Sequence, residues 1–341
     1  MDNLLEPARR PHRLRQCLSK TAIPVVLALA GLLAPQARAA QEASWPTRQV
    51  RIIVPYGPGG IADISARSIA QKMAENTGQP FVVENKPGAD TRIGTEYVAR
   101  MSGDSHILLL GGGGFAVNNA LFDKLPYDTA SDFIPVGLVV SNPLLLVTGI
   151  QQPYANLGEL IAAAKNGETI TLASGGNGTL SHMSMELLSA AMGAPITHVP
   201  YKGGSAHTSD VVGGRVTGIF ENPSSALPVL RAGRYKAIAI TSAARNPAMP
   251  DVPTVAESGA ADFEVVNWFG LFAPAGVPEA AVERMAAALT QALQARDLRE
   301  RFMRDGVAVG GPTTREFGRF VASETEKWAE VVRTRNISVD R

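Results

Sequence analysis

The sequence predicts an α/β protein of two facing lobes, each a mainly parallel sheet flanked by helices. Two observations support this fold class. Stretches rich in β-branched residues alternate with stretches that are apolar at helical spacing, as in sheets covered by helices. A glycine-rich turn from strand to helix also occurs in each half of the chain, at residues 56–60 and 174–179. Because ligands bind beyond the carboxyl ends of such strands, we expect a cleft between the lobes.

The first of these turns is the clearest local signal. Val50–Val54 has the composition of a strand, and residues 62–73 are apolar at the spacing of a helix. The glycines between them let backbone N–H groups approach a ligand, and the N-terminus of the following helix favours negative charge. The stretch therefore predicts an anion pocket at the end of a strand.

The rest of the chain continues the alternation. Further strands are expected at residues 81–85, 107–110, 134–140, 144–148, 169–173, 196–199, 216–220, 237–241 and 269–273. Helices are expected at residues 92–101, 157–165 and 205–212, after the second glycine turn, and through most of the last 60 or so residues. Gly111–Gly114 is interpreted as a bend that needs no function.

Residues 1–39 are predicted to be a cleavable signal peptide. A basic segment precedes an apolar run of 13 residues, Ala22–Ala34, which is short for a membrane span. Ala37-Arg38-Ala39 then fits the small-residue pattern of a cleavage site. We expect a protein exported to the periplasm, by the Sec route in preference to the twin-arginine route that Arg9-Arg10 leaves open.

Cleavage changes the charge and removes the only cysteine. It takes away six of the 32 basic residues and two of the 31 acidic ones, which leaves 26 and 29 and a net charge of −3. The chain then has no thiol for a disulfide or a nucleophile. Nothing in this balance suggests a nucleic-acid surface.

The two turns offer candidate ligand contacts and each has a simpler explanation. The first turn matches neither phosphate-binding glycine motif. Asp63 suits the first turn of a helix and can pair with Arg67 four residues on. In the second turn, Thr179 or Ser181 can cap the following helix, but six small polar residues exceed what a cap needs.

The sequence supports a catalytic site less well than a ligand-binding site. Ser174 or Ser181 with His182 and Asp210 contains the residue types of a hydrolase triad, but no nucleophile elbow is present. The remaining histidines show no metal-ligand spacing, and we expect neither an enzyme nor a cofactor or metal. Lys202, in a turn between a strand and a helix, is a candidate partner for an anion.

In ordered series, these turns resemble the substrate-binding proteins of tripartite tricarboxylate transporters, known as Bug proteins. The resemblance covers essentially the whole chain after the signal peptide. The segments that carry it are Val50–Tyr56, Gly59-Gly60 with Asp63, Val83–Ala89, Leu125–Asp128, Ser174–Thr179, Val199–Gly204, Pro250–Thr254 and Trp268–Pro274.

The resemblance implies a periplasmic binding protein of the two-lobed, Venus-flytrap type that holds a small carboxylated ligand and delivers it to a membrane permease. Lobe 1 would comprise residues 45–143 and 265–341, lobe 2 residues 144–264, with hinge crossings near 144–149 and 265–273. A monomer is expected. The expected ligand-binding residues are Tyr56, Gly59, Gly60, Ile61, Ala62, Asp63, Ser174, Asn177, Gly178, Thr179, His182, Tyr201, Lys202, Gly203 and Glu221.

The chain also departs from the family pattern, and two other functions stay open. Asp90-Thr91 stands where the family usually has two glycines, Glu221 where it usually has aspartate, and His207 where a small residue or proline is common. These changes bear on ligand identity. One alternative function is a periplasmic sensor that presents its closed form to a signalling receptor. The other is a secreted α/β hydrolase.

Overall fold

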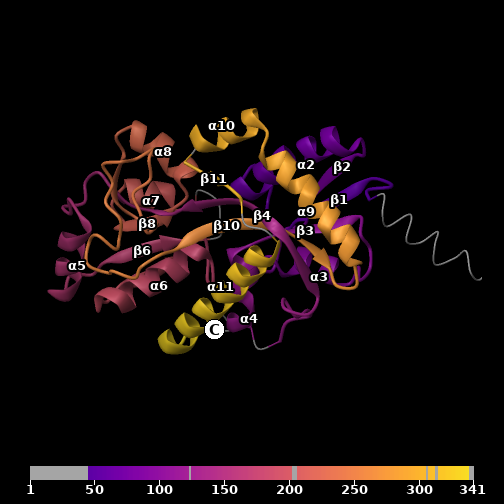
Figure 1. Cartoon of the computed structure of the whole chain (residues 1–341). Coiled ribbons are helices and arrows are strands. Elements are labelled where there is room, and N and C mark those ends of the chain that lie inside the picture. The colour runs from indigo at the N-terminus through magenta and orange to yellow at the C-terminus, as the bar shows by residue number, and fades with distance from the viewer. Residues whose placement is uncertain (1–44, 123, 202–205, 305, 312–313, 338–341) are drawn as a thin grey trace, which may run out of the picture. The chain divides into compact units, whose positions relative to one another are not determined.

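The computed structural model describes residues 45–122, 124–201, 206–304, 306–311 and 314–337. They all belong to one unit of the chain, Trp45–Arg341. The described strands form two separate sheets, and helices pack on both (Figure 1). The predicted two-sheet α/β class is therefore confirmed.

The first sheet has six strands in the order β11-β4-β10-β3-β1-β2. Parallel pairing joins β1 to both β2 and β3, whereas β10 and β4 run antiparallel to their neighbours. The strands span Val50–Val54 (β1), Phe81–Asn85 (β2), Ile107–Gly112 (β3), Phe133–Pro143 (β4), Val266–Pro274 (β10) and Ala308–Val309 (β11).

The second sheet has five strands in the order β7-β6-β8-β5-β9. Here β6 pairs in parallel with β7 and β8, and β5 is antiparallel to β8 and β9. The strands span Leu145–Gly149 (β5), Thr171–Ser174 (β6), Thr197–Pro200 (β7), Gly218–Glu221 (β8) and Tyr235–Ile240 (β9).

Both sheets are thus mixed, where mainly parallel sheets were expected. The reason lies in how the chain changes sheet. It leaves the first sheet along β4, enters the second along β5, and returns along β10, and these strands run against their neighbours. Thr241 ties the two crossings: its hydroxyl accepts from the Leu144 N–H (2.8 Å) and donates to the Val265 carbonyl (2.6 Å).

Two of the described helices, α4 and α8, were not predicted. The helices span Ile61–Thr77 (α2), Arg92–Ala99 (α3), Gly113–Leu121 (α4), Leu157–Lys165 (α5), Leu180–Met192 (α6), Thr208–Val212 (α7), Pro223–Arg231 (α8), Glu279–Leu293 (α9), Arg296–Arg304 (α10) and Thr314–Arg335 (α11).

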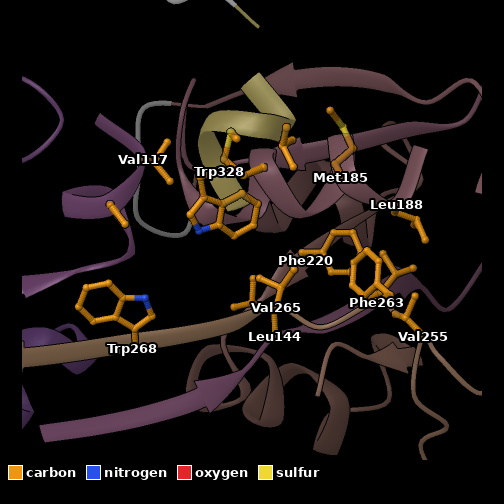
Figure 2. Close-up of a cluster of buried hydrophobic side chains, with 14 of the residues drawn as sticks. Val117, Leu144, Met185, Leu188, Phe220, Val255, Phe263, Val265, Trp268 and Trp328 are labelled. Carbon is orange, nitrogen blue, oxygen red and sulfur yellow. The ribbon is translucent and has the colours of Figure 1, made fainter. Parts of the chain in front are cut away.

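One hydrophobic cluster runs from the first sheet to the second along α11 (Figure 2). Trp268 of β10 and Trp328 of α11 are both fully buried in it. Their indole N–H groups donate to the same carboxylate, that of Glu324 (3.3 and 3.2 Å). The far end of α11 reaches α6, where Arg335 contacts Glu186 (3.2 Å). The C-terminal helix therefore packs on elements of both sheets.

Candidate functional site

A cavity of about 740 Å³ is lined by residues that follow the strands of both sheets. Its volume lies in the range of small-molecule sites. The first glycine turn lines it from one sheet and the second glycine turn from the other. A smaller hollow of about 360 Å³, between β4 and α9, contains none of the residues that the sequence singles out.

The first turn brings predicted residues to the cavity as a group. Tyr56, Gly59, Gly60, Ile61 and Ala62 all line it. Gly59 has φ +83°, a left-handed conformation that glycine adopts without steric cost. Gly60 is the N-cap of α2, and no side chain bonds to the helix end there. The first N–H groups of α2 therefore lack partners within the helix and lie beside the cavity.

Asp63 lies beneath this turn, not among the lining residues. It is 5% exposed, and its carboxylate accepts from the Gly59 N–H (3.0 Å), Asn85 Nδ2 (2.9 Å) and the Arg67 guanidinium (2.9 Å). Burial raises the pKa of this carboxyl, but the hydrogen bonds outweigh burial and hold the pKa below its ordinary value. Asn85 also donates to the Tyr56 carbonyl (3.1 Å). Asp63 and Asn85 thus brace the turn from behind.

In the second turn too, some of the predicted residues line the cavity and others support the turn from behind. Asn177, Gly178 and Thr179 line the cavity, whereas Ser174 and His182 lie behind them. The Gly178 N–H donates to His182 Nδ1 (3.0 Å). The buried Ser174 hydroxyl contacts the Gly176 backbone and also a second imidazole.

That second imidazole belongs to His198, whose Nε2 lies 2.6 Å from Ser174 Oγ. Its ring stacks on His182, with ring centroids 3.9 Å apart. Burial, together with the neighbouring His182, lowers the pKa of His198 to about 4, so it is neutral at pH 7. Asp210 bonds instead to Tyr201 (2.5 Å). The imagined hydrolase triad is therefore not assembled from these residues.

A third glycine turn, Gly111–Gly114, also contributes to the cavity. Gly111 and Gly112 end β3, α4 begins at Gly113, and Gly113 and Gly114 line the cavity. A Cβ at Gly112 would lie 2.8 Å from the Tyr56 hydroxyl oxygen and 2.8 Å from the ring of Phe269. The interpretation of this stretch as a mere bend was wrong, because its glycines let β3 pass close to the aromatic wall of the cavity. The run of four glycines was the signal available in the sequence.

Five helices of eight or more residues begin at this cavity. The N-cap or first-turn residues of α2, α3 and α4 line it from the first sheet, and those of α6 and α8 from the second. Within the described residues, none of the five has a side chain bonded to its N-terminus as a cap. Of the helices away from the cavity, α5 is capped by Asn156, which accepts from the Glu159 N–H (2.9 Å), whereas α9 also has no side-chain cap.

The loop before α3 adds two lining residues that were not predicted. Asp90 and Thr91 have φ +52° and +73°, conformations that cost a non-glycine residue about 1–2 kcal/mol each. Asn118, which also lines the cavity, donates to the Asp90 carbonyl (2.9 Å). The buried Asn118 side chain helps to hold this strained backbone. The departure of Asp90-Thr91 from the family pattern was the available signal.

Charged and titratable side chains complete the lining. Glu221, which was predicted, lies at the end of β8 beside His207, and Arg301 approaches from α10. Neither His207 nor Arg301 was predicted as a ligand contact. Tyr201 is not among the lining residues, and burial, with help from Asp210, raises the pKa of its hydroxyl to about 12.

Two predicted contacts, Lys202 and Gly203, lie outside the described residues. In the part of the chain that the structure describes, no group of three His, Cys, Asp or Glu side chains is arranged to hold a metal ion. No described helix is both long enough and apolar enough to span a bilayer.

Glycine turns from two sheets that line one cavity, with helix N-termini around it, define a two-lobed solute-binding protein. The sequence family described as "tripartite tricarboxylate transporter family receptor" matches residues 65–337. BugT of Bordetella pertussis is 35% identical over 315 residues, which cover 91% of this chain and 95% of BugT. The chain belongs to this receptor family and is a solute-binding receptor of tripartite tricarboxylate transporters.

Solved structures agree with this assignment. Rpa4515 of R. palustris, determined with adipate, has a TM-score of 0.78 and 32% identity, and the match covers 86% of this chain and 99% of Rpa4515. MatC of Rhodopseudomonas palustris, with bound malate, has a TM-score of 0.75 and 35% identity over 84% of this chain and 100% of MatC. The periplasmic binding protein BugD is 33% identical, with a TM-score of 0.75, over 86% of this chain and 99% of BugD.

Proposed function

We propose that this receptor captures a small carboxylate in the 740 Å³ cavity and delivers it to the membrane permease of a tripartite transporter. The observation that carries the proposal is the convergence of five helix N-termini without side-chain caps on that cavity. Each helix N-terminus acts as roughly half a positive charge and leaves N–H donors unpaired. A carboxylate supplies both the charge and the acceptors that such a site lacks.

The relatives support this class of ligand. Adipate and malate, named with Rpa4515 and MatC, are both carboxylates. In this chain, the direct contacts we propose are Tyr56, Gly59 to Ala62, Asn177 to Thr179 and Glu221, with Lys202 and Gly203 retained as candidates. We assign Asp63, Ser174, His182 and Tyr201 to the support of the turns that make those contacts.

We also propose that the two sheets belong to two lobes that close on the ligand. Lobe 1 takes residues 45–143 and 265–341 and lobe 2 residues 144–264. The crossings near 144–149 and 265–273 act as hinges, and the hydrogen bonds of Thr241 to both support this placement. A ligand that touches both lobes shifts the open–closed equilibrium toward the closed form. The permease then recognises that form.

The N-terminal segment supports a proposal for the cellular location of the protein. We propose that residues 1–39 direct the chain to the periplasm and are removed, and that the protein acts there as a monomer without catalysing a reaction. The family of periplasmic receptors supports this location.

The proposal is tested by removing one N–H group from the cavity. Ile61 is the first residue of α2, a position that accepts proline, and Gly60 before it is extended (φ −80°, ψ 171°), which a following proline also favours. Ile61→Pro therefore keeps the helix and removes one donor. Ile61→Ala is the matched control, because it shortens the side chain but keeps the N–H group.

We expect calorimetric titration with carboxylates such as adipate and malate to give a measurable Kd, and none with their amides. Ile61→Pro should weaken binding about 10- to 100-fold relative to Ile61→Ala, since a hydrogen bond to a charged group contributes about 1.5–3 kcal/mol. Glu279→Pro, at the same position of α9 and away from the cavity lining, should leave Kd unchanged. Equal binding of acids and amides would contradict the proposal.

A further inference from the structure

On one side of the cavity, the carboxylate of Glu221 has a hydrogen-bond partner among the described residues for only one of its two oxygen atoms. Glu221 Oε2 accepts from His207 Nε2 at 2.5 Å, and the two side chains are 12% and 4% exposed. Within the described residues, Glu221 Oε1 has no hydrogen-bond partner, and the buried His207 Nδ1 has none either. Both residues line the cavity. A buried polar pair with unmet hydrogen-bonding capacity beside a ligand cavity points to a group on the ligand.

The charges of the lining limit what that group can be. Among the described lining residues, the acids are Asp90 and Glu221, and the permanently charged base is Arg301. Arg301 is exposed and Asp90 is exposed, whereas Glu221 is largely buried. A second carboxylate on the ligand would be repelled by Glu221 at close range, because electrostatic interactions are stronger away from water. A hydroxyl or ammonium group would instead donate to Glu221 Oε1.

We propose that Glu221, held in place by His207, is a specificity subsite for a hydrogen-bond donor on the ligand. The ligand is then a hydroxy- or amino-substituted monocarboxylate and not a simple dicarboxylate. This inference rests on the proposed function, in which the glycine turns hold the carboxylate end. Sites built to bond a polar group discriminate strongly against ligands that lack it, because their own polar atoms are then left unpaired.

The test uses ligands matched in length. Calorimetric titration of the purified protein would compare succinate, 4-hydroxybutanoate, 4-aminobutanoate and butanoate, and the six-carbon series of adipate, 6-hydroxyhexanoate, 6-aminohexanoate and hexanoate. In at least one series, we expect the hydroxy or amino acid to bind at least tenfold more tightly than both the dicarboxylate and the unsubstituted acid. Preference for the dicarboxylate in both series would overturn the proposal without any variant.

Variants then assign the preference to the subsite. Glu221→Gln removes the charge and keeps the size, and we expect it to reduce the tenfold preference over the dicarboxylate to threefold or less. Glu283→Gln makes the same charge change at an exposed position of α9 and should preserve the preference. An unchanged preference in a folded Glu221→Gln protein would refute the role of Glu221. If none of the eight acids bound the unmodified protein, the carboxylate function itself would fail.

Discussion

One buried hydroxyl, that of Thr241, bonds to both crossings between the two sheets. The side chain is fully buried, and its oxygen accepts from the Leu144 N–H on one crossing and donates to the Val265 carbonyl on the other. Leu144 and Val265 are themselves 3% and 0% exposed and belong to the hydrophobic cluster of Figure 2. Thr241→Val keeps the shape of the side chain and deletes both hydrogen bonds.

The cost follows from the groups left behind. The Leu144 N–H becomes a buried donor without this partner, which costs about 1–3 kcal/mol, and the lost bond to the Val265 carbonyl contributes about 1 kcal/mol more. We therefore expect the free energy of unfolding to fall by about 2–4 kcal/mol. Thr241→Ser keeps the hydroxyl and loses only a buried methyl group, for about 1 kcal/mol.

The assay is equilibrium unfolding in urea, followed by tryptophan fluorescence and circular dichroism. Thr241→Val should lower the midpoint clearly more than Thr241→Ser, with the denaturant slope unchanged, because the surface exposed on unfolding is the same. If the valine variant were as stable as the serine variant, the hydroxyl would not join the crossings as described. Separate unfolding transitions in the valine variant would instead indicate that the two sheets no longer unfold together.

Two further predictions concern the buried polar groups. Glu324→Ala should lower the free energy of unfolding by about 2–5 kcal/mol in urea titration, because it leaves the buried indole N–H groups of Trp268 and Trp328 without an acceptor. Glu324→Gln keeps an acceptor and should lower the free energy of unfolding by less than half as much. Equal losses in the two variants would contradict this prediction. The lowered pKa of His198, about 4 against an ordinary 6.5, means that the unfolded chain takes up this proton first as pH falls. The contribution of His198 to the free energy of unfolding should therefore fall by about 2.5 kcal/mol between pH 7.5 and 4.5. The pH dependence of the urea midpoint in His198→Gln should lack that contribution.

Local sequence was a good guide to single elements. Val50–Val54 and Leu157–Lys165 are observed at the predicted bounds, because each combines a clear period with clear end signals. Pro223–Arg231 was not predicted as a helix: it contains an internal proline and is short, so its local pattern is weak. Gly113–Leu121 was missed because a glycine run normally marks a turn, whereas here buried packing carries the helix.

The candidate site was predicted in outline and revised in detail. Glycine turns and the N-termini behind them can be read from composition and spacing, and those of both halves do line one cavity. Which of these residues line the cavity, and which support the turns from behind, could not be predicted from composition and spacing. Asp63 and His182 each turn inward to bond a backbone N–H of their own turn, which depends on side-chain direction and on neighbours distant in sequence.

The sequence by itself determined the α/β class, the two glycine turns and the family resemblance, since these depend on local periodicity and on ordered motifs. The tertiary structure decided which residues meet. It brought His207 against Glu221 and placed Arg301 of a C-terminal helix at the same cavity. It also set Gly112 against the side chains of Tyr56 and Phe269. These contacts join segments far apart in the chain, and their distances arise only when both sheets and the strands between them are assembled.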